Sequence, residues 1–288
     1  MKPTIHLSLS CLITALCTIA PARAAVSYDA VADFSLSQNT DTSTWSYRYQ
    51  TGTARDGVYT LLPAYGPSNA FSPVDPGLWT LEGKRTPAAG VNQTGSDAYF
   101  IRVPDFLWPN GAMLIHPGPA NLVVVSWLSP ISALVNIDFS FSDLDPVGSG
   151  GVNWFVERNN SSGTLSAGSF GSGGTSGPLS VTGLAVSAGD RINFIVDPAA
   201  NYAYDSTRLT ASIMPVPEPS TLSGMRRLDS GAFAFTLAGP PGIYTVLVSQ
   251  GLDQWTEMSR VTNEIGFVQL IDPTATNRAR GFYLAMRE

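Results

Sequence analysis

Four aspartates that follow or separate strand patterns are the side chains of this sequence best suited to bind a metal ion. Asp143 and Asp145 lie two residues apart just after a strand pattern, so an extended chain would present both carboxylates on one side. Asp197 and Asp205 bound the loop between two later strand patterns. Hard oxygen ligands of this kind suit a structural Ca²⁺ ion. The alternative, which we favour, is that these residues form turns and accept hydrogen bonds from their own backbone.

Aromatic side chains in expected loops are the second group that could bind a ligand. Trp79 and Trp108 lie in stretches rich in glycine and proline, and Tyr202 and Tyr204 flank Ala203. Exposed rings stack on the apolar faces of sugars as they do on other flat apolar groups. An exposed concave platform of these rings would indicate a carbohydrate-binding site, whereas a buried or scattered arrangement would argue against one.

Groups that could carry out catalysis are scarce. His116 is the single histidine of residues 25–288, and its place beside Pro117 is typical of a buried or turn residue. The sequence has no G-x-S-x-G elbow, no P-loop and no G-x-G-x-x-G between a strand and a helix. Of the glutamates, Glu82 and Glu157 fall in the long β-patterned segment, and their spacing singles out no acid pair for glycoside hydrolysis. We therefore assign no catalytic residue.

Short strand patterns run through most of the chain. Val135–Ser142 alternates apolar and polar residues over eight positions, which predicts a half-buried antiparallel strand. Leu122–Leu128 is apolar on both faces except at Ser126, which predicts a central strand covered on both sides. The alternating aromatic residues of Trp45–Gln50 predict a strand with one face in the core. Because glycine, proline, asparagine, aspartate and serine turns separate such patterns, we expect an all-β, jelly-roll-like antiparallel β-sandwich.

Two stretches have the composition of linkers. Ser161–Ser180 contains six glycines and seven serines, which predicts a long loop or loose hairpin. Pro215–Ser223 has three prolines in its first five residues, and proline fixes φ and removes a backbone donor. This second stretch predicts an extended spacer between domains. We therefore place a β-sandwich domain at 25–214, a Pro-rich linker at 215–228 and a small β-sandwich module at 229–288.

The small module contains a long uncharged segment with two alternative interpretations. Ser230–Leu252 has 23 residues without a charge, which is long enough to span a bilayer as a helix. Pro240 and Pro241 lie at its centre between glycines and would break a helix there. Strand alternation on both sides of the prolines favours a β-hairpin. We therefore expect no membrane helix in the mature chain.

The first 24 residues have the three parts of a secretion signal. Lys2 supplies a positive charge, Leu7–Ala20 is an uncharged and mostly apolar core, and Ala22–Ala24 forms an A-x-A-like cleavage site. Cleavage near Ala24–Ala25 would remove both cysteines and move the formal net charge from −6 to −8. An acidic chain without a run of basic residues lacks the electrostatic surface that nucleic acid or anionic membranes require.

The linker carries a recognisable heptapeptide. Val216-Pro217-Glu218-Pro219-Ser220-Thr221-Leu222 resembles the sorting signal of PEP-CTERM proteins, which are exported to the surface of exopolysaccharide-producing bacteria. Further pieces that resemble these proteins are 28–35, 45–47, 114–118, 189–194 and 205–207, so the resemblance covers residues 27–222. It implies a jelly-roll-like sandwich of unsettled biochemical role. The chain departs from the pattern because Arg226 and Arg227 follow at once, without the usual membrane helix, and a Pro-rich linker can also spell this motif by chance.

Residues 229–288 resemble a fibronectin-type-III-like module found at the ends of many secreted bacterial proteins. The matching residues are Pro241-Gly242, Tyr244–Val246, Ser249–Trp255, Asp272-Pro273 and Phe282-Tyr283, with departures at Gln250-Gly251 and Leu284. This resemblance implies a structural or adhesive role.

Together these features predict a secreted, non-catalytic structural or interaction protein of the bacterial exterior, associated with an exopolysaccharide matrix. Its expected partners are extracellular polysaccharide or surface proteins, and nucleic acid is excluded. The alternative is a carbohydrate-binding module protein with an aromatic sugar-binding surface, and a glycoside-active hydrolase is the weaker third interpretation. No cofactor is expected apart from the structural calcium ion considered above.

Overall fold

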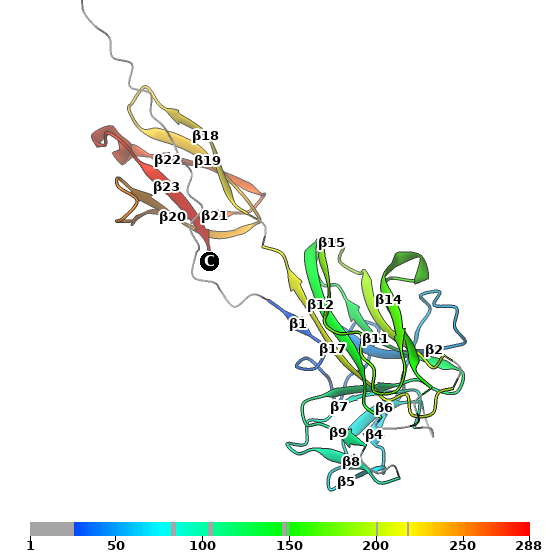
Figure 1. The fold of residues 1–288 in the computed structure, drawn as a ribbon. Helices are drawn as coiled ribbons and strands as arrows, with labels where there is room; N and C mark the ends of the chain where they lie inside the picture. Colours follow the sequence, from blue (N-terminus) through cyan, green and yellow to red (C-terminus); the bar gives the residue numbers. More distant parts are fainter. Residues whose placement is uncertain are drawn as a thin grey trace, which may run out of the picture. The chain divides into compact units, whose positions relative to one another are not determined.

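The computed structural model describes residues 26–81, 85–102, 106–145, 148, 150–199, 201–217 and 219–288 (Figure 1). The expected signal peptide, Glu82 and Glu218 lie outside the described residues. The described chain is all-β and divides into two compact units, a large one over Val26–Val216 and a small one within Pro217–Glu288. Its described part includes no helix that is long and apolar enough to cross a bilayer.

Two antiparallel sheets form the body of the large unit (Figure 1). The first sheet has, in spatial order, β15 (Leu179–Val186), β12 (Ala133–Asp143), β17 (Thr207–Pro215), β10 (Met113–His116), β7 (Ala88–Val91), β6 (Gly77–Thr80) and β4 (Ala64–Pro67), with β1 (Tyr28–Asp29) on β17. The second has β14 (Thr164–Phe170), β13 (Val152–Arg158), β16 (Arg191–Asp197), β11 (Asn121–Leu128), β2 (Trp45–Thr51) and β3 (Thr60–Leu61). A third, short sheet contains β5 (Phe71–Ser72), β8 (Ala98–Phe100) and β9 (Leu107–Trp108).

The main core lies between the two larger sheets. Strand β12 contributes Val135, Ile137, Phe139 and Phe141, which are all buried as the alternation predicts. Strand β11 is buried on both faces: one face joins this core, and the other packs in a second cluster around Tyr59. Each such side chain contributes roughly 1.5–3 kcal/mol when it is fully removed from water.

The serine- and glycine-rich stretch is not simply a loop, so that prediction is wrong in part. Within it, β14 pairs with β13 as the edge strand of the second sheet. The glycine at position 168 has a packing role, because a Cβ atom there would lie 2.5 Å from Cζ2 of Trp154. The small residues of β14 therefore leave room for the buried indole of Trp154. The composition of the stretch did not predict this packing.

The small unit is a sandwich of two three-stranded antiparallel sheets (Figure 1). One sheet contains β18 (Thr221–Arg227), β19 (Phe233–Ala238) and β22 (Phe267–Asp272), and the other contains β21 (Thr256–Asn263), β20 (Gly242–Ser249) and β23 (Phe282–Arg287). Its core is Phe235, Leu237, Tyr244, Val246 and Leu270. Two short 3₁₀ turns, Ser161–Gly163 in the large unit and Pro273–Asn277 in the small one, complete the described elements.

Two expectations about this unit are corrected. Residues 221–227 were placed in the linker, but they form β18, which pairs with β19 at the edge of a sheet. The uncharged segment is two strands, as expected, but not a hairpin: β19 and β20 belong to opposite sheets. Pro240 and Pro241 lack the N–H groups that a tight hairpin ladder uses, and they carry the chain across the sandwich instead.

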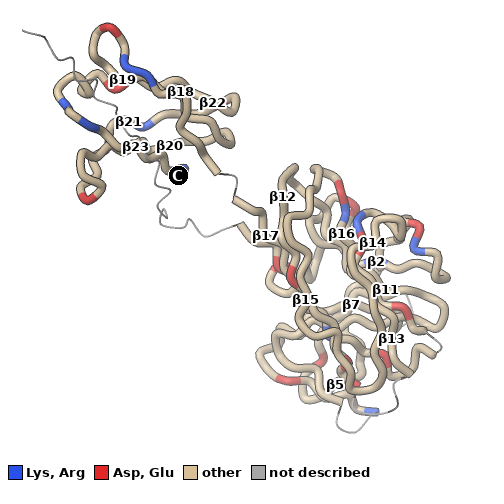
Figure 2. Tube along the Cα trace, turned by 45° about the horizontal axis from the view of Figure 1, so that its top comes forward, with Lys and Arg blue, Asp and Glu red and all other residues tan. Residues whose placement is uncertain are grey.

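Charged residues are sparse along the described trace (Figure 2). Apart from the neighbouring pair Arg226 and Arg227 on β18, Figure 2 shows no run of basic residues in the part of the chain that the structure describes.

Candidate functional site

The large unit contains a pocket of about 340 Å³ on the face of the first sheet that points away from the main core. Strands β6, β7 and β10 supply one wall through Leu78, Ala88 and Leu114. The short third sheet and its loops supply the opposite wall. The complete lining is Ser68, Ala70, Phe71, Leu78, Arg85, Thr86, Ala88, Phe100, Phe106, Leu114, His116, Asp145, Ala203, Tyr204 and Ser206.

Aromatic rings from separate strands form the apolar wall of this pocket. Phe71 of β5 is paired in register with Phe100 of β8, and their ring centroids lie 5.4 Å apart at an interplanar angle of 64°. Phe106 meets Phe100 edge-on at 5.7 Å. Beneath them Trp108 is fully buried, and its ring centroid lies 5.2 Å from that of Phe71. Edge-to-face contacts of this kind fix the ring orientations and leave apolar ring surface facing the pocket.

A glycine allows the short sheet to approach the first sheet closely. At Gly90 on β7, a Cβ atom would lie 2.7 Å from Cδ2 of Leu78 and 3.1 Å from Cη2 of Trp108. The absence of a side chain at this position therefore lets the indole pack directly on the strand and supports the wall of the pocket.

His116 supplies a neutral polar group at the end of β10. Its Nδ1 lies 2.6 Å from the carbonyl oxygen of Pro117. Because a carbonyl only accepts, we assign the proton to Nδ1, which leaves Nε2 as an acceptor. Burial lowers the pKa of His116 to about 4, so the imidazole is uncharged at neutral pH.

Asp145 is the one carboxylate among the described residues that line the pocket. Its side chain is 6% exposed, and Oδ2 accepts a hydrogen bond from the backbone N–H of Ser206 at 2.7 Å. Burial raises the pKa of Asp145 to about 6, although the hydrogen bonds from Ser206 act in the opposite direction. Between about pH 4 and pH 6 both side chains are therefore uncharged.

The rim of the pocket carries one exposed tyrosine, Tyr204, and a cation, and a second exposed tyrosine, Tyr202, lies near His116 without lining the pocket. Tyr204 is 41% exposed and has φ of +63°, a backbone conformation that bulky residues rarely adopt. Tyr202 is 37% exposed and its ring meets that of His116 at a centroid distance of 6.3 Å. Arg85 is exposed, and no ion pair or hydrogen bond joins its side chain to another described residue.

The expected aromatic platform is wrong for its two tryptophans. Trp79 lies in the main core and its Nε1–H donates to the carbonyl of Ser35 at 2.8 Å. Trp108 donates in the same way to the carbonyl of Ala112 at 2.8 Å. The single N–H donor of each indole therefore bonds to a backbone carbonyl. Both rings fill space between strands, although glycine and proline are frequent near them in the sequence. Of the four aromatic candidates, only Tyr202 and Tyr204 are exposed.

The aspartates proposed for calcium accept hydrogen bonds from nearby backbone. Asp143 accepts from the N–H of Asp145 at 2.9 Å and from that of Gly173 at 2.7 Å. Asp197 accepts from the N–H of Ala199 at 2.7 Å, and Asp205 is buried. Within the described residues, no group of three or more His, Cys, Asp or Glu side chains is arranged to hold a metal ion. Calcium binding at these residues stays a prediction.

Glu157 anchors a loop on the outer face of the second sheet. Its carboxylate is fully buried, pairs with Arg55 and accepts from the hydroxyl of Tyr59 at 3.3 Å. The guanidinium carbon of Arg55 lies 3.6 Å from the ring centroid of Phe155. Since its oxygens are occupied by these partners, Glu157 is a structural residue that holds the segment 52–59 across the sheet.

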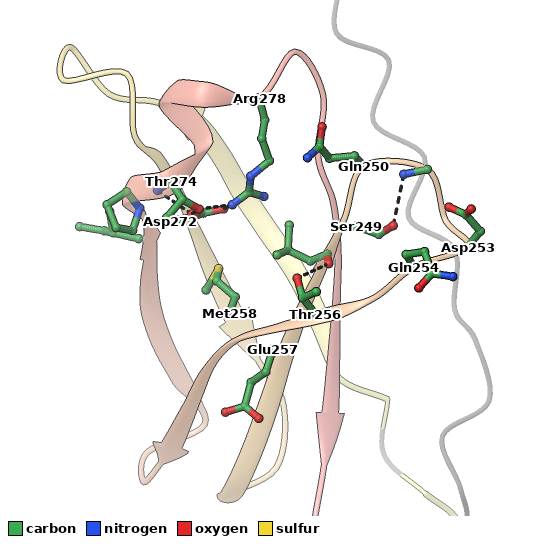
Figure 3. A pocket seen from close by; sticks show the side chains of 14 residues that line it. Ser249, Gln250, Asp253, Gln254, Thr256, Glu257, Met258, Asp272, Thr274 and Arg278 are labelled. Atoms are coloured by element: carbon green, nitrogen blue, oxygen red, sulfur yellow. Dashed lines mark hydrogen bonds and ion pairs between the residues drawn. The ribbon is translucent and has the colours of Figure 1, made fainter.

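The small unit has a polar cleft of about 470 Å³ at one end of its sandwich (Figure 3). No aromatic side chain lines it, and its buried carboxylate already has partners: Asp272 accepts from Arg278 at 2.7 Å and from the N–H of Thr274 at 2.9 Å. Figure 3 shows Gln250, Asp253 and Gln254 on the segment between β20 and β21, to one side of this pair. We therefore interpret the cleft as the open end of the sandwich and the pocket of the large unit as the candidate site.

Comparisons with known proteins leave the family open. No family model matches the chain, and no curated protein matches it. Among solved structures, the N-terminal CBM22-1–CBM22-2 tandem domain of Paenibacillus barcinonensis Xyn10C is 10% identical, with 94% of this chain and 92% of that chain covered and a TM-score of 0.26. A β-1,2-glucanase from Parabacteroides distasonis is 9% identical, with 85% and 34% covered and a TM-score of 0.22, so the chain spans about one third of that enzyme. Likeness at these TM-scores does not transfer a ligand or an activity.

A pair of single substitutions tests the assignment of the two titrating groups. The folded pKa of Asp145 lies above its ordinary value of 3.8, so its contribution to stability is complete below pH 3.8 and is lost as the pH rises through about 6. The folded pKa of His116 lies below 6.5, so its contribution is complete above pH 6.5 and is lost as the pH falls through about 4. Relative to the parent, Asp145→Asn should therefore gain stability as the pH rises from 4 to 7, on the order of 2–3 kcal/mol, and His116→Gln should gain it as the pH falls from 7 to 4.

Urea unfolding of the parent and both variants at several pH values measures these differences. Gains that follow the same pH trend in both variants, or that do not change with pH, would contradict the burial of the two groups in the pocket.

Proposed function

We propose that the protein is an exported, non-catalytic, carbohydrate-binding β-sandwich protein that works in or near an exopolysaccharide matrix of the bacterial exterior. One observation carries the proposal. Tyr204 presents an exposed ring at a pocket whose lining combines apolar rings with polar groups, among them His116 and Asp145, which are held by hydrogen bonds. The export signal and the PEP-CTERM-like motif in the sequence support the location.

The chemistry of a sugar fits this combination of groups. A pyranose has apolar C–H faces that stack on an aromatic ring, and hydroxyl groups at its edge that need hydrogen-bond partners. The ring of Tyr204 is available for stacking at the rim. Nε2 of His116 can accept from one hydroxyl, and the guanidinium of Arg85 can donate to another oxygen.

A binding role fits the pocket better than hydrolysis. Glycoside hydrolysis uses two carboxyl groups on opposite sides of the scissile bond. The described lining of the pocket holds one carboxylate, that of Asp145. The buried carboxylate of Glu157 is paired with Arg55 on the second sheet. We infer that the site holds its ligand without cleaving it.

The test is a glycan array and polysaccharide pull-down with residues 25–288, in the presence and absence of calcium, followed by titration of the polysaccharide that binds. We expect Tyr204→Ala to weaken that binding about 3- to 10-fold, because an aromatic contact contributes roughly 0.5–1.5 kcal/mol beyond its buried area.

The matched control for this substitution is Tyr99→Ala. Tyr99 is also an exposed tyrosine, but it neighbours Phe100 on β8 and does not line the pocket. Equal losses in the two variants, or no binding of any polysaccharide by the parent, would count against the proposed function. Release of soluble sugar during the incubation would show a hydrolase instead.

The proposed location has a separate test. Strand β18 begins at Thr221, within the PEP-CTERM-like motif, and the chain after it forms the rest of the small sandwich. We therefore expect the mature protein in the culture supernatant without detergent, measured by immunoblotting of cell fractions. Recovery in the membrane fraction alone would contradict this expectation.

A further inference from the structure

We propose that the pocket of the large unit holds an aromatic acyl group esterified to a sugar, while the sugar ring itself lies at the rim against Tyr204. This inference rests on the proposed function and names the ligand class of the same site. It follows from the contrast between the apolar interior of the pocket and its polar mouth.

The interior of the pocket is poorly suited to an unsubstituted sugar ring. The hydrogen-bonding side chains of the lining are Ser68, Arg85, Thr86, His116, Asp145, Tyr204 and Ser206. The rest of the wall includes Phe71, Leu78, Phe100, Phe106 and Leu114, none of which can form a hydrogen bond with a hydroxyl group. Each hydroxyl buried there without a partner would cost roughly 1–3 kcal/mol. A pyranose carries several hydroxyl groups, so the volume of about 340 Å³ favours an apolar occupant.

The geometry of the walls favours a ring over a flexible chain. Phe100 meets Phe71 and Phe106 edge-on, at interplanar angles of 64° and 84°, while Phe71 and Phe106 are tilted by 44° to each other. A further aromatic ring can continue this edge-to-face arrangement, because the positive edge of one ring is attracted to the negative face of the next.

The polar groups favour a neutral ester over a free acid. Asp145 lines the same pocket, so a free carboxylate would bring a second negative charge toward a buried carboxyl group. An ester avoids this repulsion and keeps a carbonyl oxygen as acceptor. Arg85, which has no partner among the described side chains, can donate to that oxygen from the rim.

Isothermal titration of the full mature chain with three small probes tests the inference. The probes are methyl 6-O-benzoyl-glucopyranoside, its unesterified parent methyl glucopyranoside, and ethyl benzoate, which has the acyl group without the sugar. We expect the benzoylated sugar to bind at least ~10-fold more tightly than either of the others, since burial of an aromatic ring is favourable and the sugar adds the contact with Tyr204.

Three outcomes of these titrations would overturn the inference. Equal affinity for the two sugars would overturn the inference, and the proposed function would then stand or fall on the polysaccharide pull-down alone. Equal affinity for ethyl benzoate and the benzoylated sugar would also overturn it, because the sugar would then contribute nothing. Absence of binding by all three probes would overturn it as well.

Two variants locate the preference in the pocket. Ala88→Leu places a larger side chain in the apolar wall and should abolish the preference for the benzoylated sugar. Arg85→Gln replaces the exposed charged guanidinium with a shorter neutral amide without changing the core, and it should weaken binding of the ester about 10-fold, because hydrogen bonds to charged groups are the stronger ones. Arg226→Gln, at an exposed position of the small unit, is the control and should leave binding unchanged. If Ala88→Leu does not fold, retention of full affinity by Arg85→Gln is sufficient to overturn the proposed placement.

Discussion

Replacing Asp272 with alanine is expected to unfold the small unit and leave the large one folded. The Asp272 carboxylate is fully buried, and it accepts from Thr274, from Arg278 at 2.7 Å and from the hydroxyl of Tyr283 at 3.0 Å. Burial by itself would raise the pKa of Asp272, but these donors outweigh it and hold the pKa below its usual value. The carboxylate therefore satisfies four donors, from Thr274 (N–H and hydroxyl), Arg278 and Tyr283, at the junction of β22, the 3₁₀ turn and β23.

The expected cost is comparable to the whole stability of the unit. Removal of one partner of a buried ion pair costs about 3–5 kcal/mol, because the other charge stays buried without compensation. A domain of this size has a total stability of roughly 4–10 kcal/mol. Hydrogen exchange of the full mature chain should show protection lost throughout β18–β23 and kept in the large unit.

Asp253→Ala is the matched control, because Asp253 is an exposed aspartate in a loop of the same cleft (Figure 3). It should leave exchange in the small unit unchanged. Full protection of β22 and β23 in Asp272→Ala would show that the carboxylate is not the structural anchor described here.

Trp108→Ala is expected to have the largest effect on the large unit. This indole is fully buried under the pocket, packs edge-on against Phe71 and donates to the carbonyl of Ala112. Its truncation should cost about 3–5 kcal/mol through lost burial and the cavity that remains. In a unit of this size, that corresponds to a fall in melting temperature of roughly 10 °C, together with loss of ligand binding.

Calorimetry of Trp108→Ala and Trp108→Phe measures this effect. The phenylalanine variant keeps an aromatic ring but loses the bond to Ala112, so its melting temperature should lie between those of the parent and the alanine variant. Trp255→Ala removes a tryptophan of the small unit and should not change the melting of the large one. A change of less than about 2 °C in Trp108→Ala would contradict the role of this indole in the pocket wall.

The strands that line the main cores could be predicted because every second residue in them is buried, which gives the sequence a two-residue alternation of apolar and polar side chains. The alternation of β12 and the two apolar faces of β11 both identify strands that the structure confirms. Strands with little buried surface could not be found in this way. Strand β14 is rich in glycine and serine, and β18 carries exposed arginines, so both have the composition of linkers. Pairing with a neighbouring strand, which depends on tertiary structure, makes them strands.

The site was predictable only at its rim. Tyr202 and Tyr204 could be predicted as sugar contacts because they flank Ala203 in an expected loop, where exposed rings can stack on a sugar. The interior rings Phe71, Phe100 and Phe106 lie singly in short segments far apart in the sequence, and only the pairing of β5 with β8 brings them together. The tryptophans were misplaced because a glycine- and proline-rich context was taken as exposure, whereas in the structure each indole donates to a backbone carbonyl in the interior.

The measurement that tests the central claim most directly is hydrogen exchange of the mature chain with and without a saturating polysaccharide ligand. We expect new protection in the segments that form the pocket, around residues 68–78, 98–102 and 201–206, and none in the small unit. Protection confined to the cleft around Asp272, or none in the three pocket segments, would contradict the assignment of the pocket as the binding site.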